Sequence, residues 1–309
     1  MKRVLITGAT GFVGANLARR LLKEGHEIHL LIRPAHKPWR MEEIRKDAHW
    51  HEVELTDAAA VARVVGKIRP DWVFHLAAYG AYSSQRDLET MVQTNILGTV
   101  HLLEACLRTG FESFVNTGSS SEYGVKDHAP SETEIVEPNS HYAVTKASAT
   151  LFCRYTARHH EAPVSTLRLY SVFGPYEEQT RLIPTLIRRG LKGELPPLVD
   201  PDGAHDFVFI DDVLDAYLLA TTVAHQELGA VYNIGTGTQT TMREVVEIAQ
   251  RVLEIPAEPV WGSMPNRSWD TAVWLANSQK AWTALHWKPR TSFENGFRRT
   301  VEWFRQRPQ

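Results

Sequence analysis

Short apolar runs alternate with longer amphipathic segments along the first half of the chain. Val4–Ile6 and Ile28–Ile32 are uninterrupted apolar runs, as expected for strands buried on both faces of a sheet. Between them, apolar residues recur at helical spacing over Asn16–Leu22. The same alternation then repeats. Further strands are predicted over His49–Leu55, Trp72–Ala78 and Phe111–Thr117, and further helices over Ala58–Ile68, Glu89–Arg108 and His141–His160.

This repeated alternation predicts an α/β fold, a doubly wound parallel sheet with right-handed crossovers. We expect residues 1–170, with parts of 205–240, to form a dinucleotide-binding Rossmann domain. Residues 171–309 are expected to add a smaller, discontinuous α/β substrate lobe, interwoven with the first domain because no linker or repeat separates them. Helices of this second lobe are predicted over Arg181–Leu191, Asp211–Thr222, Met242–Leu253 and Phe293–Phe304.

The bulk composition excludes several classes of protein. With 309 residues, 43% of them hydrophobic and 23% charged, the chain can bury a full core. A net charge of -2 provides no basic field, so neither nucleic acid nor a membrane is expected as a partner. The apolar run near Met1 is too short for a signal peptide, which predicts a cytoplasmic protein. Cys106 and Cys153 lie in apolar helical patterns and are expected to be buried, reduced thiols, and no metal site is predicted.

A glycine cluster follows the first predicted strand and opens directly into the first predicted helix. Gly8 would make the turn, Gly11 would let the backbone approach a diphosphate, and Gly14 would let the helix pack close to the strand. Free N–H groups at the start of the helix would then point at anionic oxygens. The plainer alternative is a glycine-rich turn without a ligand, but the flanking strand and helix favour a dinucleotide site.

The end of the second predicted strand bears on the choice of cofactor. An NAD site usually has an acid here for the ribose 2′-hydroxyl, whereas a 2′-phosphate needs a cation without a neighbouring carboxylate. The chain has Arg33 at this point, with Lys37 and Arg40 nearby and no acid. We therefore expect NADP, with NAD as the second choice. The alternative is that Arg33 is a solvated loop residue.

Hydroxyl groups and a tyrosine–lysine pair follow the strand predicted over Phe111–Thr117. A serine run at the carboxyl end of a parallel strand is well placed to meet a substrate, although a plain serine-rich turn would look the same. Tyr142 and Lys146 stand four residues apart and share one helix face. The ammonium would lower the phenol pKa toward the range useful for proton exchange with a sugar hydroxyl. The spacing alone is a weak signal, and its position after the serine run strengthens it.

Several motifs occur in a fixed order, and together they carry a family resemblance. The chain resembles the extended short-chain dehydrogenase/reductases that act on nucleotide sugars, over nearly its whole length. The motifs are Thr7-Gly8-Ala9-Thr10-Gly11-Phe12-Val13-Gly14, His75-Leu76-Ala77-Ala78, the serines before Tyr123-Gly124, Tyr142-x-x-x-Lys146, Arg168-Leu169-Tyr170-Ser171-Val172-Phe173-Gly174-Pro175, the segment from Asp206 to Val213, and Tyr232-Asn233-Ile234-Gly235-Thr236-Gly237.

The resemblance implies roles for individual positions. Tyr142 would be the general acid/base, Lys146 its electrostatic partner and a ribose ligand, and Ser119 a hydrogen-bond donor to the reacting oxygen. The implied cofactor-binding residues are Gly8, Gly11, Phe12, Val13, Gly14, Arg33, Glu54, Leu55, Leu76, Ala77, Ala78, Tyr142 and Lys146. A nucleotide-diphosphate sugar is the implied substrate, and the residues implied to bind it are Tyr79, Ser120, Ser121, Ser171, Arg181 and Arg267. Trp261 or Trp269 could stack on the base.

Departures from the family pattern reduce the number of reactions that the chain is expected to catalyse. The 4,6-dehydratases of the family carry an acidic pair where this chain has Ser120 and Ser121, with Glu122 one position late, so elimination of water is disfavoured. Ser171 and His205 stand where many relatives have Asn and Arg, which puts two diphosphate contacts in doubt.

Three functions are consistent with these features. The leading expectation is NADPH-dependent reduction of the 4-keto group of a nucleotide-linked 4-keto-6-deoxyhexose, because the loop over residues 78–88 is similar to those of paratose and abequose synthases. The alternative is a 4-epimerase that retains NAD(P), and a more remote one is a non-catalytic NADP-sensing protein. The resemblance also suggests a homodimer joined through the helices Glu89–Arg108 and His141–His160.

Overall fold

Seven parallel strands form the centre of the molecule. The computed structural model describes residues 1–36, 38–264 and 273–307. The strand order β3-β2-β1-β4-β5-β6-β10 is that of a Rossmann sheet. The chain first adds strands on one side of β1 and then, from β4 onward, on the other side, so the point of reversal lies between β1 and β4. Ligands bind such sheets at the carboxyl ends of the strands beside this reversal. The strands are β1 (Arg3–Thr7), β2 (Glu27–Ile32), β3 (His49–Glu52), β4 (Trp72–His75), β5 (Ser113–Ser119), β6 (Val164–Leu169) and β10 (Ala230–Ile234).

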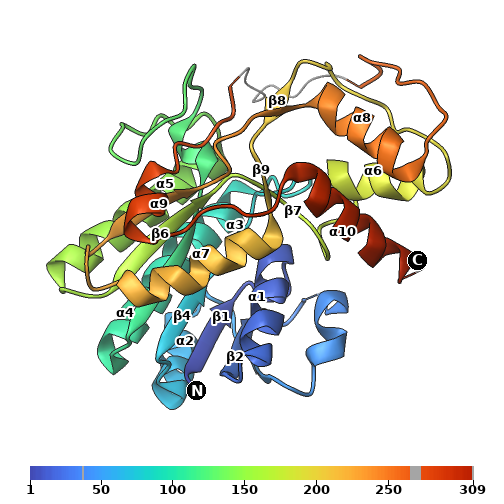
Figure 1. The fold of residues 1–309 in the computed structure, drawn as a ribbon. Helices are drawn as coiled ribbons and strands as arrows, with labels where there is room; N and C mark the ends of the chain where they lie inside the picture. The colour runs from blue at the N-terminus through green and yellow to red at the C-terminus, as the bar shows by residue number, and fades with distance from the viewer. Residues whose placement is uncertain (37, 265–272, 308–309) are drawn as a thin grey trace.

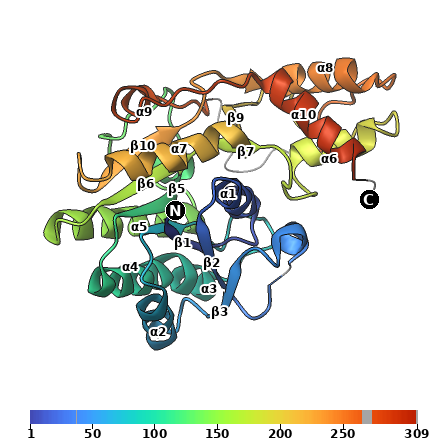
Figure 2. The same cartoon turned by 60° about the horizontal axis from the view of Figure 1, so that its bottom comes forward.

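Helices cover both faces of the sheet (Figures 1 and 2). On the strands of the centre, side chains alternate between two cores, so that Val4 and Ile6 belong to one and Leu5 to the other. The first core packs under α1 (Phe12–Lys23) and α7 (Ile210–Val223). The opposite face carries α2 (Ala58–Ile68), α4 (Gly98–Thr109) and α5 (His141–His159), and this two-sided cover explains why the strands read as continuous apolar runs.

A smaller C-terminal α/β region lies beyond the carboxyl ends of the strands (Figure 1). Asp206 ties its parts together, because its buried carboxylate accepts the N–H groups of Thr236, Gly237 and Ala276. The region contains α6 (Leu182–Gly190), α8 (Met242–Leu253), α10 (Phe293–Arg305) and the short strand pairs β7 (Ser171–Phe173) with β9 (Phe207–Phe209) and β8 (Ala204–His205) with β11 (Thr240–Thr241). The short helix α9 (Gln279–Ala284) packs instead beside β10.

The predicted α/β class and parallel sheet are confirmed, with differences in detail. The strand predicted to Ala78 ends at His75, and the backbone of Leu76 and Ala77 then passes close to Gly8. The strand predicted to Leu55 ends at Glu52. Strands β6 and β10 were not predicted, because the apolar and polar residues of each do not alternate regularly.

The helix predicted over Glu89–Arg108 is built from three pieces. α3 (Leu88–Val92) continues into a π-helical turn at Gln93–Leu97 before α4 begins. A π turn changes which side chains face inward without breaking the helix, so apolar spacing alone does not reveal it.

Two bulk predictions concern the cysteines and the membrane. Cys106 and Cys153 are buried free thiols, as expected. Within the described residues, no helix combines the length and apolar character that crossing a bilayer requires.

Candidate active site

The glycine loop is packed too tightly for side chains at two positions. Gly8 adopts φ +69°, and a Cβ there would lie 2.5 Å from the Leu76 carbonyl carbon. A Cβ on Gly14 would lie 2.4 Å from the Gly8 carbonyl oxygen. Gly11 is the N-cap of α1 and offers no side chain to the first N–H groups of the helix. Those groups, on Phe12, Val13 and Gly14, could therefore hold a diphosphate.

Three cations were expected near the end of β2, and one of them, Arg33, is exposed. Arg40 is instead buried: it donates to the carbonyl of Tyr176 at 2.7 Å and lies 3.0 Å from the Glu178 carboxylate, so it is a structural residue. Lys37 lies outside the described residues. Beyond β3, Glu54 is exposed and Leu55 is buried.

A buried hydrogen-bond chain joins the glycine loop to the helix over Leu88–Thr109. The Ala77 N–H donates to Thr7 Oγ1 at 3.2 Å, which in turn donates to His75 Nδ1 at 2.7 Å. His75 Nε2 donates to Thr99 Oγ1 at 2.9 Å, because that hydroxyl donates onward to the Asn95 carbonyl. Burial, with a contribution from Lys146, lowers the pKa of His75 to about 3, so the ring is neutral. Both ring nitrogens and both threonine hydroxyls in this series of hydrogen bonds therefore have partners.

Ser119, Tyr142 and Lys146 gather at the carboxyl end of β5. Ser119 is the last residue of β5, and the other two lie on the first two turns of α5, which Ser140 caps by accepting the Ala143 N–H at 3.2 Å. Burial raises the pKa of Tyr142 to about 12, and a hydrogen bond with Ser119 opposes the rise. In the described part of the chain, Lys146 Nζ makes no hydrogen bond, although the side chain is buried.

Burial is the largest influence on the pKa of both Tyr142 and Lys146. It lowers the pKa of Lys146, opposed by the Glu122 carboxylate, and it raises that of Tyr142, with the Glu122 carboxylate acting in the same direction. Desolvation disfavours the charged form of each group, the phenolate of Tyr142 and the ammonium of Lys146.

Glu122 points into the protein rather than toward the substrate side. Its carboxylate is fully buried and accepts the Ser119 N–H at 2.8 Å, the Thr150 hydroxyl at 3.0 Å and Arg168 Nε at 2.8 Å. Ser119 and Glu122 form a capping box around the short helix Ser120–Tyr123. The Ser-x-x-Glu spacing in the sequence was the available signal for this structural role.

A small pocket lies beside the serine turn. Ser120, Tyr123, Tyr170 and Trp274 contribute to its wall. The Tyr170 hydroxyl is buried and has no partner among the described residues, so it could bind a polar group placed in the pocket. Ser121 lies next to it, with its hydroxyl 2.8 Å from that of Ser119.

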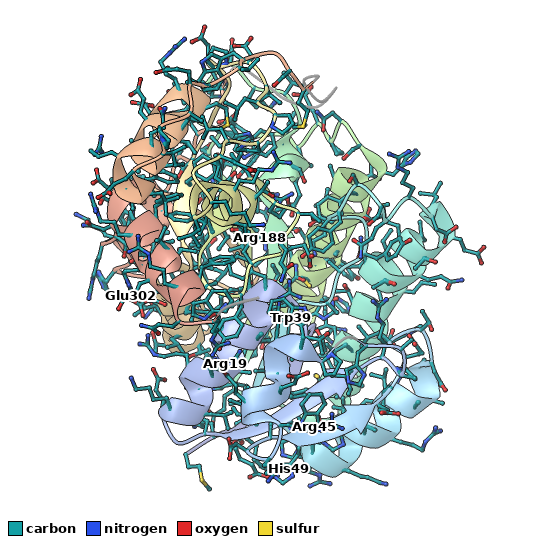
Figure 3. All side chains as sticks on the ribbon, turned by 90° about the vertical axis from the view of Figure 1, so that its right-hand side faces the viewer. Arg19, Trp39, Arg45, His49, Arg188 and Glu302 are labelled. Atoms are coloured by element: carbon teal, nitrogen blue, oxygen red, sulfur yellow. The ribbon has the colours of Figure 1, made fainter. Side chains whose placement is uncertain are left out.

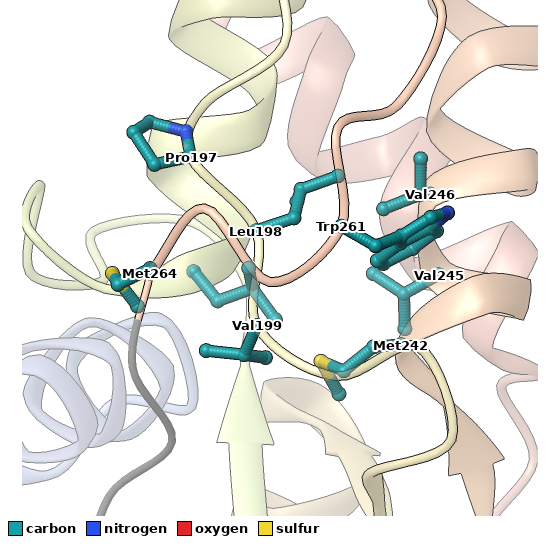
Figure 4. A pocket seen from close by; sticks show the side chains of 9 residues that line it. Pro197, Leu198, Val199, Met242, Val245, Val246, Trp261 and Met264 are labelled. Atoms are coloured by element: carbon teal, nitrogen blue, oxygen red, sulfur yellow. The ribbon is translucent and has the colours of Figure 1, made fainter.

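The remaining predicted substrate residues are more scattered. Tyr79 is half-buried, Ser171 lies on β7, and Arg181 is exposed at the N-cap of α6. Arg267 and Trp269 lie outside the described residues. Trp261 lines a small apolar pocket between α6 and α8, where its indole lies against Val245 and Val246 (Figure 4); the structure uses it for packing.

Asn95 is a site residue that the sequence reasoning missed. It lies in the π-helical turn and is buried. Its side chain accepts the Tyr79 N–H at 2.8 Å, donates to the Tyr79 carbonyl at 2.8 Å, and donates to Thr145 Oγ1 at 2.8 Å. Asn95 thus joins the loop after β4 to α5, the helix that carries Tyr142 and Lys146. A single Asn within an apolar helical pattern was the only available signal.

Comparisons with known proteins agree with this geometry. Residues 4–235 match the model of the NAD dependent epimerase/dehydratase family. UDP-glucose 4-epimerase of Mycolicibacterium smegmatis is 29% identical, with 99% of this chain and 100% of the relative aligned. dTDP-glucose 4,6-dehydratase of Neisseria meningitidis is 28% identical over 98% of this chain and 93% of the relative.

Solved structures of similar shape include two epimerases. UDP-glucose 4-epimerase of Thermotoga maritima, solved with UDP-glucose, has a TM-score of 0.88 and 29% identity, and the match covers 98% of each chain. UDP-glucuronic acid 4-epimerase of Bacillus cereus, solved with UDP-glucuronic acid and NAD, has a TM-score of 0.86 and 27% identity, covering 98% of this chain and 99% of the other. The glycine loop and the serine–tyrosine–lysine cluster are thus carried on a fold shared with nucleotide-sugar enzymes.

Proposed function

The chain belongs to the NAD-dependent epimerase/dehydratase family of nucleotide-sugar enzymes, and from this premise we propose that it is a nucleotide-sugar 4-epimerase acting on a UDP-hexose. The observation that carries the choice of reaction is the orientation of Glu122. A dehydratase needs an acid and a base beside the serine turn. Ser120 and Ser121 occupy that place, and the nearest carboxylate is buried in an ion pair with Arg168.

Ser119, Tyr142 and Lys146 have different roles at the C4 oxygen of the sugar. A bound nicotinamide dinucleotide supplies reversible hydride acceptance. Tyr142 takes the proton from the C4 hydroxyl and returns it, while Ser119 donates a hydrogen bond to the same oxygen. Lys146 has no hydrogen-bond partner in the described part of the chain, which leaves its ammonium for the cofactor ribose and for stabilising the phenolate.

The second candidate is NADPH-dependent reduction of a 4-keto-6-deoxyhexose. Exposed Arg33, with no acid at the end of β2, favours a 2′-phosphate and hence this reaction. The relatives named above are 4-epimerases and a 4,6-dehydratase, and the solved epimerase complex holds NAD. For this reason epimerisation stands first.

Two measurements separate these candidates. Extraction of the purified protein and mass spectrometry identify any retained nucleotide. Incubation with UDP-glucose or UDP-glucuronate, followed by NMR of the sugar and absorbance of reduced cofactor, measures turnover. Interconversion of C4 epimers without net change in the cofactor is expected. Stoichiometric consumption of NADPH with a 4-keto-6-deoxysugar, and no epimer formed from the UDP-hexoses, would favour the reductase and contradict this proposal.

We also propose that the active protein is a homodimer. One face of α5 exposes large apolar side chains, with Leu151 57%, Phe152 45% and Tyr155 64% accessible. Leu88 and Leu97, 46% and 44% exposed, continue the apolar surface on the neighbouring helix. An apolar surface built from two adjacent helices is suited to pairing with its own copy. Leu151→Glu should shift the sedimentation coefficient from dimer to monomer, and an unchanged dimer would contradict this interface.

A further inference from the structure

A cluster of metal-ligating side chains lies at the amino end of the sheet, opposite the candidate active site. Glu27 is the first residue of β2 and His49 the first of β3. The parallel register places His29 beside His49. Because residues two apart in a strand share a face, Glu27, His29, His49 and His51 project from one side of the sheet. The sequence did not show this cluster, since His29 and His49 are 20 positions apart in the chain and are brought together only by the pairing of β2 with β3.

Three ligand atoms converge within this cluster. Glu27 Oε1 lies 3.0 Å from His29 Nε2 and 3.9 Å from His49 Nε2. All three atoms lie within 4.8 Å of one another. A tetrahedral ion with bonds of about 2.0–2.2 Å needs ligand atoms roughly 3.3–3.5 Å apart. The His49 side chain is 62% exposed, so its ring is free to make the small movement that this geometry requires.

A further histidine orients the buried member of the cluster. His29 Nδ1 lies 3.0 Å from His51 Nε2, so an Nδ1–H group can donate to His51 while Nε2 faces Glu27 and His49. Metal-binding histidines commonly donate their second N–H in this way, which fixes the tautomer and the ring direction.

We propose that Glu27, His29 and His49 bind one divalent transition-metal ion of the zinc, nickel or copper class, with His51 orienting His29. Two imidazoles and one carboxylate suit these ions, whereas magnesium and calcium prefer oxygen ligands alone. β3 is the outermost strand of the sheet and has four residues, so a bound ion would hold it to β2. Figure 3 shows His49 at the outer surface of the molecule, where an ion can enter. The proposal does not depend on the reaction catalysed.

Metal binding is measured directly on the untagged, chelator-treated protein. Zn²⁺ is titrated in competition with a chromophoric chelator, and one ion per chain is expected with a Kd in the micromolar range or below. His49→Ala should raise the Kd at least about tenfold, because it removes a ligand without opening the core. His225→Ala, at an exposed histidine elsewhere, is the matched control and should leave the Kd unchanged.

Two further readouts distinguish a ligand from a merely structural histidine. Added Zn²⁺ should raise the Tm of the wild-type protein and of His225→Ala but not that of His49→Ala. Electron paramagnetic resonance of the Cu²⁺ form should show two nitrogen ligands, and one in the His49→Ala protein. Equal Zn²⁺ affinity of wild type and His49→Ala, or no binding by the wild type at micromolar Zn²⁺, would overturn the proposal.

Discussion

Two neighbouring groups of buried polar residues meet at the end of β5, and they differ in how completely they are paired. In the structural group, Glu122 with Thr150 and Arg168, the carboxylate of the ion pair accepts three hydrogen bonds, and Arg168 Nη1 is the buried atom left without a partner among the described residues. In the reactive group, Ser119 and Tyr142 are half-buried and Lys146 is as buried as the members of the structural group, yet Lys146 Nζ makes no hydrogen bond within the described residues. Burial by itself therefore does not distinguish a residue that holds the fold from one that is free to react.

The difference has a physical basis. A buried charge without partners is costly, so it persists only where something other than stability retains it. The Glu122 carboxylate is fully buried, accepts three hydrogen bonds and is paired with Arg168, which is why it is structural although it follows three serines. The two groups should consequently respond to mutation in opposite ways.

The largest effect is expected in the reactive group. Tyr142→Phe removes the proton donor and acceptor but keeps the packed ring, so kcat should fall by about 10²–10⁴-fold. The free energy of unfolding should change by less than about 1 kcal/mol, because only a hydroxyl is lost. Steady-state kinetics and urea unfolding measure both quantities. Unchanged turnover would remove Tyr142 from the catalytic group.

The structural group should respond in stability. Glu122→Gln leaves Arg168 buried without its counter-charge, and we expect the free energy of unfolding to fall by about 3 kcal/mol. Urea unfolding followed by circular dichroism measures this loss. Glu227→Gln, which breaks the exposed pair with Lys280, is the control and should cost less than about 1 kcal/mol. A loss of similar size in both variants would show that pairing in the structural group is unimportant.

His75 is another buried side chain whose polar atoms all have hydrogen-bond partners, and we expect it to affect the stability of the fold. Its pKa is about 3 in the folded protein and about 6.5 in the unfolded chain, so the unfolded chain binds the proton more readily between these values. Stability should therefore fall as pH decreases below 6.5, by about 2 kcal/mol between pH 7.5 and pH 5 for this group. The lowered pKa values of His26, His29 and His51 act in the same direction.

The contribution of His75 is isolated by comparison with His75→Gln, which keeps the other histidines. Over the same pH range this variant should lose about 2 kcal/mol less of its own free energy of unfolding than the wild type does. Parallel pH dependence of the two proteins would mean that His75 is not buried neutral.

The smallest effect is expected at the boundary between the two groups. The Ser121 hydroxyl lies 2.8 Å from that of Ser119 and orients it. Ser121→Ala should lower kcat by about fivefold, the equivalent of about 1 kcal/mol for one lost hydrogen bond. Ser148→Ala, on the same helix as Tyr142 but bonded only to the Val144 carbonyl, should leave kcat unchanged. Equal kcat values for the two variants would remove Ser121 from the orientation of Ser119.

The sequence by itself determined the fold class and the position of the candidate active site along the chain. Glycine spacing between a strand and a helix is a local requirement, and Gly8 and Gly14 indeed leave no room for a Cβ. The alternation of apolar runs predicted the parallel sheet, and the carboxyl ends of its strands then located Ser119 and Tyr142. All of these depend on residues close together in the chain, where backbone geometry dictates the outcome.

Only the tertiary structure decided which polar groups are paired. The partner of Arg40 is Glu178, that of Glu122 is Arg168, and Asn95 joins Tyr79 to Thr145 across separate elements. These pairings, and the histidine cluster of β2 and β3, depend on strand order and register, which bring together residues that are distant in the chain. Local spacing carries no information about such contacts, so the roles of these side chains could be assigned only once the sheet was assembled.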